Sequence, residues 1–233
     1  MHSPRALLLD LDDTLLDDRG AMADAVLVFR TKHGLSKSES DDLIAARWDS
    51  IGREVWRKMA LGELSFVEQR RVRLRETFLL TLSDVDADEL FESYLECYQQ
   101  SWRLLPGVDV FLERTAHLPR AIVTNGHGPQ ARKKLSLLGL GEVFDAVVTP
   151  DDCGGARKPD PKIFRYALDL LDVAPDEVMM IGDNEEADIA PALALGMRCF
   201  HVRHQQSGFS IADAANAICS LEPRSAMKVE PVG

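Results

Sequence analysis

Short apolar runs alternate with amphipathic segments along most of the chain, and their order predicts the fold class. Aliphatic runs bounded by Gly, Asp or Pro predict five strands, over 6–11, 120–124, 146–149, 178–181 and 198–202. Helical periodicity between the later runs predicts helices over 130–138, 162–171 and 188–194. Strands that alternate with helices favour a parallel sheet with helices on both of its faces.

Residues 17–104 interrupt this alternation. They contain no strand pattern, and their apolar spacing predicts four helices, over 21–33, 40–56, 65–80 and 86–102. The turn at Pro106-Gly107 returns the chain to the strand–helix pattern. We therefore predict an α/β protein with a Rossmann-like parallel sheet core and an inserted α-helical domain. The core would comprise 1–16 and 105–221, the insertion 17–104, and a loosely held tail 222–233.

Composition and charge restrict the class of protein. The 233 residues are 45% hydrophobic and 28% charged, which is typical of a globular chain. The apolar run near the N-terminus is too short for a signal peptide, and no run is long enough to span a bilayer. The net charge of −11 argues against binding to a nucleic-acid polymer. Four scattered cysteines without a CxxC pair indicate reduced thiols, so we expect a cytoplasmic protein without a membrane partner.

Chemistry-bearing residues follow the predicted strands. Because ligands of an open parallel sheet bind beyond the carboxyl ends of its strands, residues at those ends form a candidate site. Seven residues follow three of the strands, and one lysine precedes a helix: Asp10, Asp12, Thr124, Asn125, Gly126, Asp183, Asp188 and Lys158. Alternating side chains in extended backbone would direct Asp10 and Asp12 to the same side.

Each of these residues also has an ordinary structural interpretation. The acidic stretch could be a solvated loop in which Asp13 or Thr14 caps the next helix. Lys158 alone is typical of a surface lysine, and Asp183 and Asp188 suit a helix N-cap and first turn. The joint occurrence of all of them, in this order and at these ends, favours a functional site.

The stretches "DLDDT", "TNG", "KP" and "GDNEEAD" carry a resemblance to a known family. In that order they resemble the four signature motifs of the haloacid dehalogenase-like (HAD) hydrolase superfamily, in its phosphatase branch with a helical cap inserted after the first motif. The similarity covers 5–16 and 105–203. Pro191 and Leu195 depart from the Gly and Ala of many relatives, on the helix beyond the last motif.

The resemblance implies a Mg²⁺-dependent phosphatase that hydrolyses a small phosphomonoester, a nucleotide or sugar phosphate, through an aspartyl phosphate. Asp10 would be the nucleophile, and Asp12 the general acid and base. Lys158 would neutralise negative charge on the nucleophile and the phosphate. The segment of Thr124, Asn125 and Gly126 would hold the phosphoryl oxygens. Asp10 and Asp183 would bind Mg²⁺ by side chain and Asp12 by its carbonyl, with Asp188 steadying the water shell.

Other activities of the superfamily remain as alternatives. Sugar phosphomutases share the four motifs and a helical cap, and differ by keeping water from the phosphorylated enzyme. Dehalogenases lack counterparts of Asp12 and Asp183, which disfavours that activity, and an inactive binding module is disfavoured because no catalytic position is replaced. The insertion would select the substrate, with residues 17–19, Arg53, Trp56 and Arg57 as candidate contacts. The sequence leaves the physiological substrate and the oligomeric state open.

Overall fold

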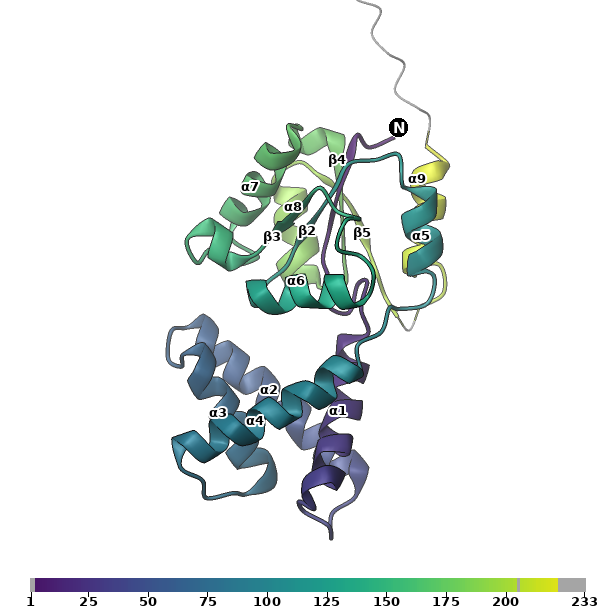
Figure 1. The fold of residues 1–233 in the computed structure, drawn as a ribbon. Helices are drawn as coiled ribbons and strands as arrows, with labels where there is room; N and C mark the ends of the chain where they lie inside the picture. Colours follow the sequence, from purple (N-terminus) through teal and green to yellow (C-terminus); the bar gives the residue numbers. More distant parts are fainter. Residues whose placement is uncertain (1–2, 205, 222–233) are drawn as a thin grey trace, which may run out of the picture. The chain divides into compact units, whose positions relative to one another are not determined.

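A computed structural model describes residues 3–204 and 206–221 (Figure 1). The predicted tail, 222–233, lies outside these residues. Contacts between Cα atoms divide the chain into two compact units. The core unit joins the segment that ends at Leu16 to the segment that begins at Leu104, and the helical unit comprises Asp17–Arg103.

Five parallel strands form the sheet of the core unit, in the order β3-β2-β1-β4-β5 (Figure 1). The strands are β1 Ala6–Leu9, β2 Arg120–Val123, β3 Ala146–Val148, β4 Val178–Gly182 and β5 Arg198–His201. The predicted α/β class with a parallel sheet and a helical insertion is confirmed. The chain moves outward from β1 in one direction and later in the other, so β1 and β4 flank the switch point where such sheets bind ligands.

Helices cover both faces of the sheet because alternate strand residues are apolar on both sides. Leu7 and Leu9 pack on one face with helices α5 Val108–Arg114, α6 Gly128–Leu137 and α9 Ile211–Cys219. Ala6 and Leu8 pack on the other face with α7 Pro161–Leu171 and α8 Ala190–Ala194. The sequence pattern had predicted α6 and α7 but not α5 and α9. Within the described residues, no helix is sufficiently long and apolar to traverse a membrane.

The helical unit contains α1 Asp18–His33, α2 Asp41–Ala60, α3 Phe66–Phe78 and α4 Asp84–Gln100. Each helix packs on two of the others, and an aromatic cluster that includes Trp48 and Tyr94 fills the space between them. Trp48 Nε1 donates a hydrogen bond of 3.2 Å to the hydroxyl of Tyr94. Serine side chains cap the starts of α2, α3 and α4, which explains where these helices begin.

Two predicted helix starts are corrected by the structure. Asp17, rather than Asp13 or Thr14, caps α1, and its carboxylate accepts from the backbone N–H of Gly20. The helix predicted over 188–194 consists instead of a π-helical turn, Glu185–Ile189, followed by α8. The cap of that turn is Asn184, whose side chain accepts two backbone N–H groups, so neither Asp183 nor Asp188 is used as a cap.

The two segments that connect the units are paired with each other. Leu16 forms an antiparallel bridge with Leu104, and the backbone N–H of Leu105 donates to the carbonyl of Leu15 at 2.9 Å. Before this bridge the chain makes a tight loop in which the N–H groups of Leu15 and Leu16 donate to the carbonyl of Leu11. Leu11, Leu15 and Leu16 are buried, so this acidic stretch is anchored in the core by its leucines.

Candidate active site

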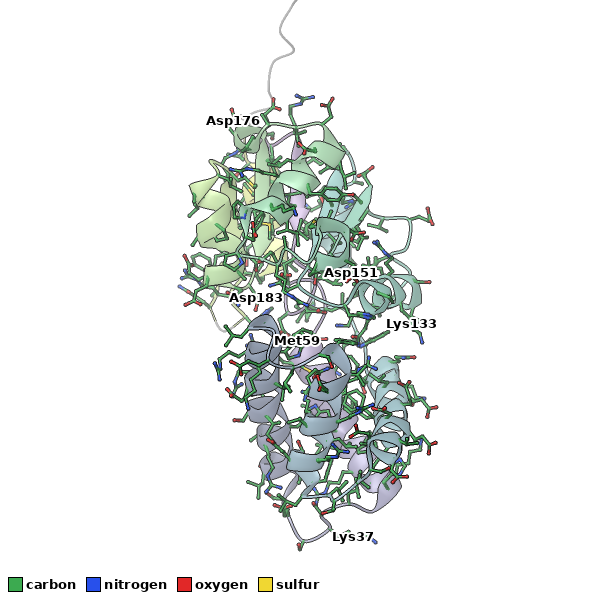
Figure 2. All side chains as sticks on the ribbon, turned by 90° about the vertical axis from the view of Figure 1, so that its left-hand side faces the viewer. Lys37, Met59, Lys133, Asp151, Asp176 and Asp183 are labelled. Atoms are coloured by element: carbon green, nitrogen blue, oxygen red, sulfur yellow. The ribbon has the colours of Figure 1, made fainter. Side chains whose placement is uncertain are left out.

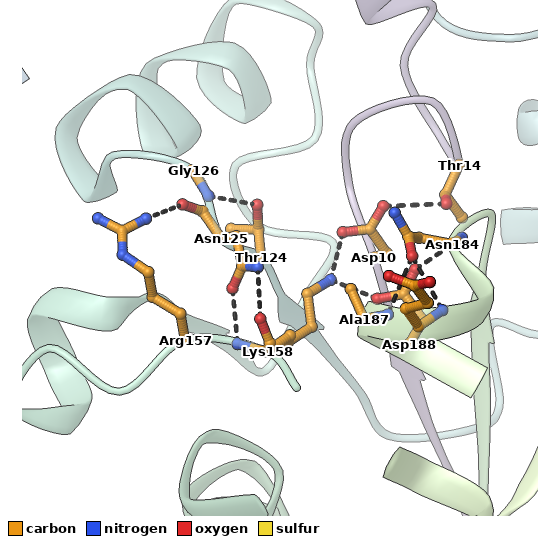
Figure 3. Close-up of polar contacts among 11 residues, drawn as sticks. Asp10, Thr14, Thr124, Asn125, Gly126, Arg157, Lys158, Asn184, Ala187 and Asp188 are labelled. Atoms are coloured by element: carbon orange, nitrogen blue, oxygen red, sulfur yellow. Dashed lines mark hydrogen bonds and ion pairs between the residues drawn. The ribbon is translucent and has the colours of Figure 1, made fainter. Parts of the chain in front are cut away.

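Asp10 lies directly beyond the carboxyl end of β1, and two buried side chains hold its carboxylate (Figure 3). Its backbone N–H continues the pairing with β4 by donating to the carbonyl of Ile181. Oδ1 accepts from Lys158 Nζ at 2.6 Å, and Oδ2 accepts from the hydroxyl of Thr14 at 3.0 Å. Asp10 is therefore buried with a fixed orientation at the switch point of the sheet.

Lys158 bridges two carboxylates from different parts of the chain. Its Nζ donates to Asp10 Oδ1 and to Asp188 Oδ1, both at 2.6 Å, and the residue is only 5% exposed. Asn125 fixes the backbone of Lys158, since its side chain accepts from the Lys158 N–H at 2.7 Å and donates to the Lys158 carbonyl at 2.9 Å. Burial alone would lower the pKa of Lys158, but Asp10 and Asp188 outweigh it and raise the pKa above its ordinary value.

Asp188 turns back from the π-helical turn toward the end of β4. Its Oδ2 accepts from the backbone N–H of Asn184 at 3.1 Å, and the residue is 1% exposed. Asp183 follows β4 directly, whereas Asp176 marks the opposite end of that strand (Figure 2). One carboxylate oxygen from each of Asp10, Asp183 and Asp188 lies within 4.8 Å of the other two.

These carboxylates make a site that favours a cation. Burial raises the pKa of Asp10 to about 6, and although Lys158 opposes this shift, the charge of Asp188 adds to it. An ionised Asp10 is thus costly here even with a lysine beside it. A divalent cation between the three carboxylates would remove that cost.

The loop after β2 brings backbone donors to the same end of the sheet. Thr124 Oγ1 accepts from the backbone N–H of Gly126 at 3.0 Å, which closes a tight turn. Arg157 donates to the carbonyl of Asn125 at 3.0 Å and so braces the loop (Figure 3). Among the described residues no acceptor pairs with the backbone N–H of Asn125. The loop therefore offers a hydroxyl and a backbone donor to a ligand.

Asp12 is placed apart from the three clustered carboxylates. Its Oδ1 pairs at 2.5 Å with Nζ of Lys134, a residue of α6 that is 4% exposed. A Cβ atom built on Gly126 would lie 3.5 Å from Asp12 Oδ2 and 3.2 Å from Thr124 Oγ1. The side chain of Asp12 thus lies between α6 and the loop after β2.

The sequence interpretation overlooked three residues of this arrangement. Thr14 was considered only as a possible helix cap, yet it donates to Asp10 from four residues away. Gly182 gives Asp188 the space to pack against β4. Lys134 had a detectable signal, because it follows the buried Ala131 at the helical spacing of three residues, on a face where a lysine is unexpected.

Gly182→Ala is expected to damage the site through a steric conflict. The added methyl group would overlap the carboxylate, Cγ and Cβ of Asp188, which is buried and held by Lys158. We expect a loss of about 1–3 kcal/mol in the free energy of unfolding, as for other overpacked cores, together with weaker metal binding. Chemical denaturation and calorimetric titration with Mg²⁺ measure the two effects.

Gly141→Ala is the matched control, because the nearest atom to its added Cβ is Ser136 Cα at the ordinary contact distance of 3.9 Å. If Gly182→Ala proved as stable and as active as Gly141→Ala, the packing of Asp188 against Gly182 would have no consequence for the site.

Comparison with known proteins places the chain in a family. The model of the haloacid dehalogenase-like hydrolase family matches residues 4–196. A phosphoserine phosphatase of Thermus thermophilus is 30% identical over 221 residues, covering 85% of this chain and 88% of that protein. An N-acylneuraminate-9-phosphatase of Rattus norvegicus is 28% identical over 209 residues, covering 83% and 80%.

Solved structures share the fold over most of the chain. An HAD phosphatase from Thermococcus onnurineus aligns with a TM-score of 0.60 and 27% identity, covering 94% of this chain and 99% of that one. The Bacillus subtilis protein YfnB, solved with bound magnesium, aligns with a TM-score of 0.73 and 24% identity, covering 86% and 89%. The chain belongs to the haloacid dehalogenase-like hydrolase family.

Proposed function

We propose that this protein is a Mg²⁺-dependent phosphatase that hydrolyses a small phosphomonoester through a phosphorylated Asp10. The observation that supports this most directly is the buried Asp10 carboxylate, held by Thr14 and Lys158 beside two further carboxylates. The family supplies further support, since two of the relatives described above are a phosphoserine phosphatase and an N-acylneuraminate-9-phosphatase.

The three clustered carboxylates fit a magnesium ion. Mg²⁺ prefers oxygen ligands at about 2.1 Å, which places two ligand oxygens at most about 4.2 Å apart. Oxygens that already lie within 4.8 Å of one another need only small side-chain movements to reach that spacing. Asp10 and Asp183 would bind the ion by side chain and Asp12 by its carbonyl, while Asp188 would hold the bound water. The ion would screen phosphate from the carboxylates and draw charge from the phosphoryl oxygens.

In the first chemical step, one carboxylate oxygen of Asp10 attacks phosphorus. The bond between phosphorus and the ester oxygen breaks, and Asp12 gives its proton to the departing oxygen, so an alcohol leaves. Thr124, the backbone N–H of Asn125 and Lys158 hold the phosphoryl oxygens during the transfer. Two hydrogen bonds already tie Asn125 to Lys158, which supports a joint role of these residues.

In the second step, water attacks the phosphorus of the aspartyl phosphate. Asp12, now a carboxylate, takes a proton from this water, the acyl phosphate bond breaks, and inorganic phosphate and the Asp10 carboxylate are regenerated. The net reaction converts a phosphomonoester and water into an alcohol and phosphate.

A substrate panel tests the proposal. It would contain phosphoserine, N-acylneuraminate 9-phosphate, phosphoglycolate, nucleoside monophosphates and β-glucose 1-phosphate, each assayed for inorganic phosphate and organic product with Mg²⁺ or EDTA. We expect Mg²⁺-dependent phosphate release in proportion to substrate consumed. Isomerisation of the sugar phosphate without phosphate release, or turnover undiminished by EDTA, would contradict the proposal.

Asp183→Asn should weaken Mg²⁺ binding without unfolding the core. Replacing one of three clustered carboxylates with a neutral amide should raise the Kd for Mg²⁺ by about tenfold or more, which corresponds to about 1.4 kcal/mol. Calorimetry measures the Kd, and the rise in Tm on adding Mg²⁺ should shrink in parallel. Asp176→Asn, an exposed position at the other end of β4, is the control and should bind Mg²⁺ as the wild type does. Equal Mg²⁺ affinity in both variants would contradict the metal assignment.

A further inference from the structure

Lys134 lies outside the four motif stretches, although its ion-pair partner Asp12 belongs to the first of them. Lys134 lies on α6 between Ala131 and Leu135, both of which pack in the hydrophobic core. A lysine is seldom buried unless it is paired, because removing its charge from water is costly. The pairing with Asp12 therefore accounts for a cation on the inward face of this helix.

The two partners differ in how firmly the fold holds them. The Lys134 side chain is 5% exposed, whereas the Asp12 side chain is 30% exposed. The lysine stem is fixed by the packing of α6 on the sheet, and Asp12 stands on the loop beyond β1. In this pair the lysine is the anchor, and the carboxylate is the group whose orientation it sets.

The two oxygens of Asp12 face different neighbours. Oδ1 pairs with Lys134 at 2.5 Å, and Oδ2 lies on the side of Gly126, toward which Thr124 Oγ1 also points. Because the ammonium group of Lys134 donates to Oδ1, a proton carried by Asp12 would sit on Oδ2. That oxygen faces the loop assigned above to the phosphoryl group.

We propose that Lys134 is a positioning residue, which fixes the Asp12 carboxyl so that Oδ2 delivers its proton to the leaving oxygen. This rests on the proposed phosphatase function, in which Asp12 is the general acid. Lys134 itself touches neither the substrate nor the reacting atoms. Its loss should therefore harm proton delivery more than binding of the phosphate.

Dependence on the leaving group separates this role from a general structural one. A poor leaving group needs the proton of Asp12, while 4-nitrophenolate is stable enough to leave with little help. The experiment measures kcat/KM with Mg²⁺ for phenyl phosphate and for a series of substituted phenyl phosphates. Their leaving phenols are more acidic than phenol, while the esters differ little in shape. In Lys134→Met we expect kcat/KM for phenyl phosphate to fall at least about tenfold more than for 4-nitrophenyl phosphate.

Lys133→Met is the matched control, since it makes the same substitution one residue away at an exposed position of α6 (Figure 2). It should leave the dependence on the leaving group unchanged. Lys134→Arg, which keeps a cationic donor, should show a dependence on the leaving group between those of Lys134→Met and the wild type. In an Asp12→Asn background, Lys134→Met should cause no further change in kcat/KM across the series. The carboxyl group that Lys134 positions is already absent from that variant.

Equal losses on all phenyl phosphates in Lys134→Met, or an unchanged profile, would overturn the positioning role while leaving the phosphatase proposal intact. A wild type that releases no phosphate from any ester with Mg²⁺ would overturn both. Should Lys134→Met fail to fold, Lys134→Gln carries the same comparison, because it removes the charge but keeps a polar donor on the helix.

Discussion

Asp10→Asn is expected to abolish turnover while the protein stays folded. An amide oxygen is too weak a nucleophile to attack phosphorus, so kcat should fall by about 10⁴-fold or more. The fold should persist, because asparagine has nearly the size of aspartate and can still accept the hydrogen bond from Thr14. Lys158 retains its pairing with Asp188. Phosphate release and thermal unfolding, measured on the same preparation, test both parts.

A chemical trap sharpens this prediction. The phosphomonoester would carry radioactive phosphorus, and the reaction of the wild type would be quenched in acid during turnover. The protein should then carry a labelled phosphoryl group. Hydroxylamine should remove this group, because it cleaves acyl phosphates. Asp10→Asn should carry none, and Asp10→Ala excludes residual activity from deamidation. Labelling of Asp10→Asn at the level of the wild type would assign the nucleophile to another residue.

Lys158→Met should have the second largest effect. It should reduce both the free energy of unfolding and the catalytic activity. Removing the cation leaves two buried carboxylates, Asp10 and Asp188, facing each other without their common partner. Breaking a buried ion pair in this way costs about 3–5 kcal/mol, which we expect in the metal-free protein at neutral pH. Activity with Mg²⁺ should fall by about 10²–10³-fold, as when one transition-state donor is removed.

The loss of stability in Lys158→Met should depend on pH and on metal. The pKa of Asp10 is raised even with the lysine present, so a folded protein without Lys158 takes up a proton that the unfolded chain releases. Its stability relative to the wild type should therefore recover as the pH falls from 7.5 toward 5. Mg²⁺ should raise the Tm of this variant more than that of the wild type, because the ion replaces the missing charge.

Lys162→Met is the control for these measurements, since Lys162 is exposed on α7, four residues from Lys158. Denaturation in EDTA across this pH range, repeated with Mg²⁺, provides the comparison. A Lys158→Met variant as stable as Lys162→Met at neutral pH would show that the buried carboxylates do not need the lysine.

The sequence predicted the sheet well because each buried strand is a short apolar run with a clear boundary. It also predicted that Asp10, Asp183, Asp188 and Lys158 would meet, because the carboxyl ends of neighbouring parallel strands share one edge. The structure brings these four side chains into one cluster. Their chemical roles, and those of Thr124 and Gly126, stay predictions that the variants above address.

What the sequence did not predict depends on contacts between distant residues. The pairing of Lys134 with Asp12 joins positions 122 residues apart, and only the packing of α6 on the sheet brings them together. The π-helical turn at Glu185–Ile189 was likewise not predicted, and its Asp188 accepts a hydrogen bond from Lys158, 30 residues away. Periodicity along the chain cannot reveal either feature, because both arise between elements.

The bridge between Leu16 and Leu104 has a consequence for how such a chain can diversify. The helical unit leaves the core after Leu16 and returns at its bridge partner Leu104, and the hydrogen bond from Leu105 to Leu15 beside this pair closes the core at the point of insertion. Because loop closure entropy grows only slowly with length, an insertion of a different size would cost the core little. This junction is thus a natural site for recombination, at which a foreign helical unit or a short turn could be grafted without disturbing the residues that follow β1.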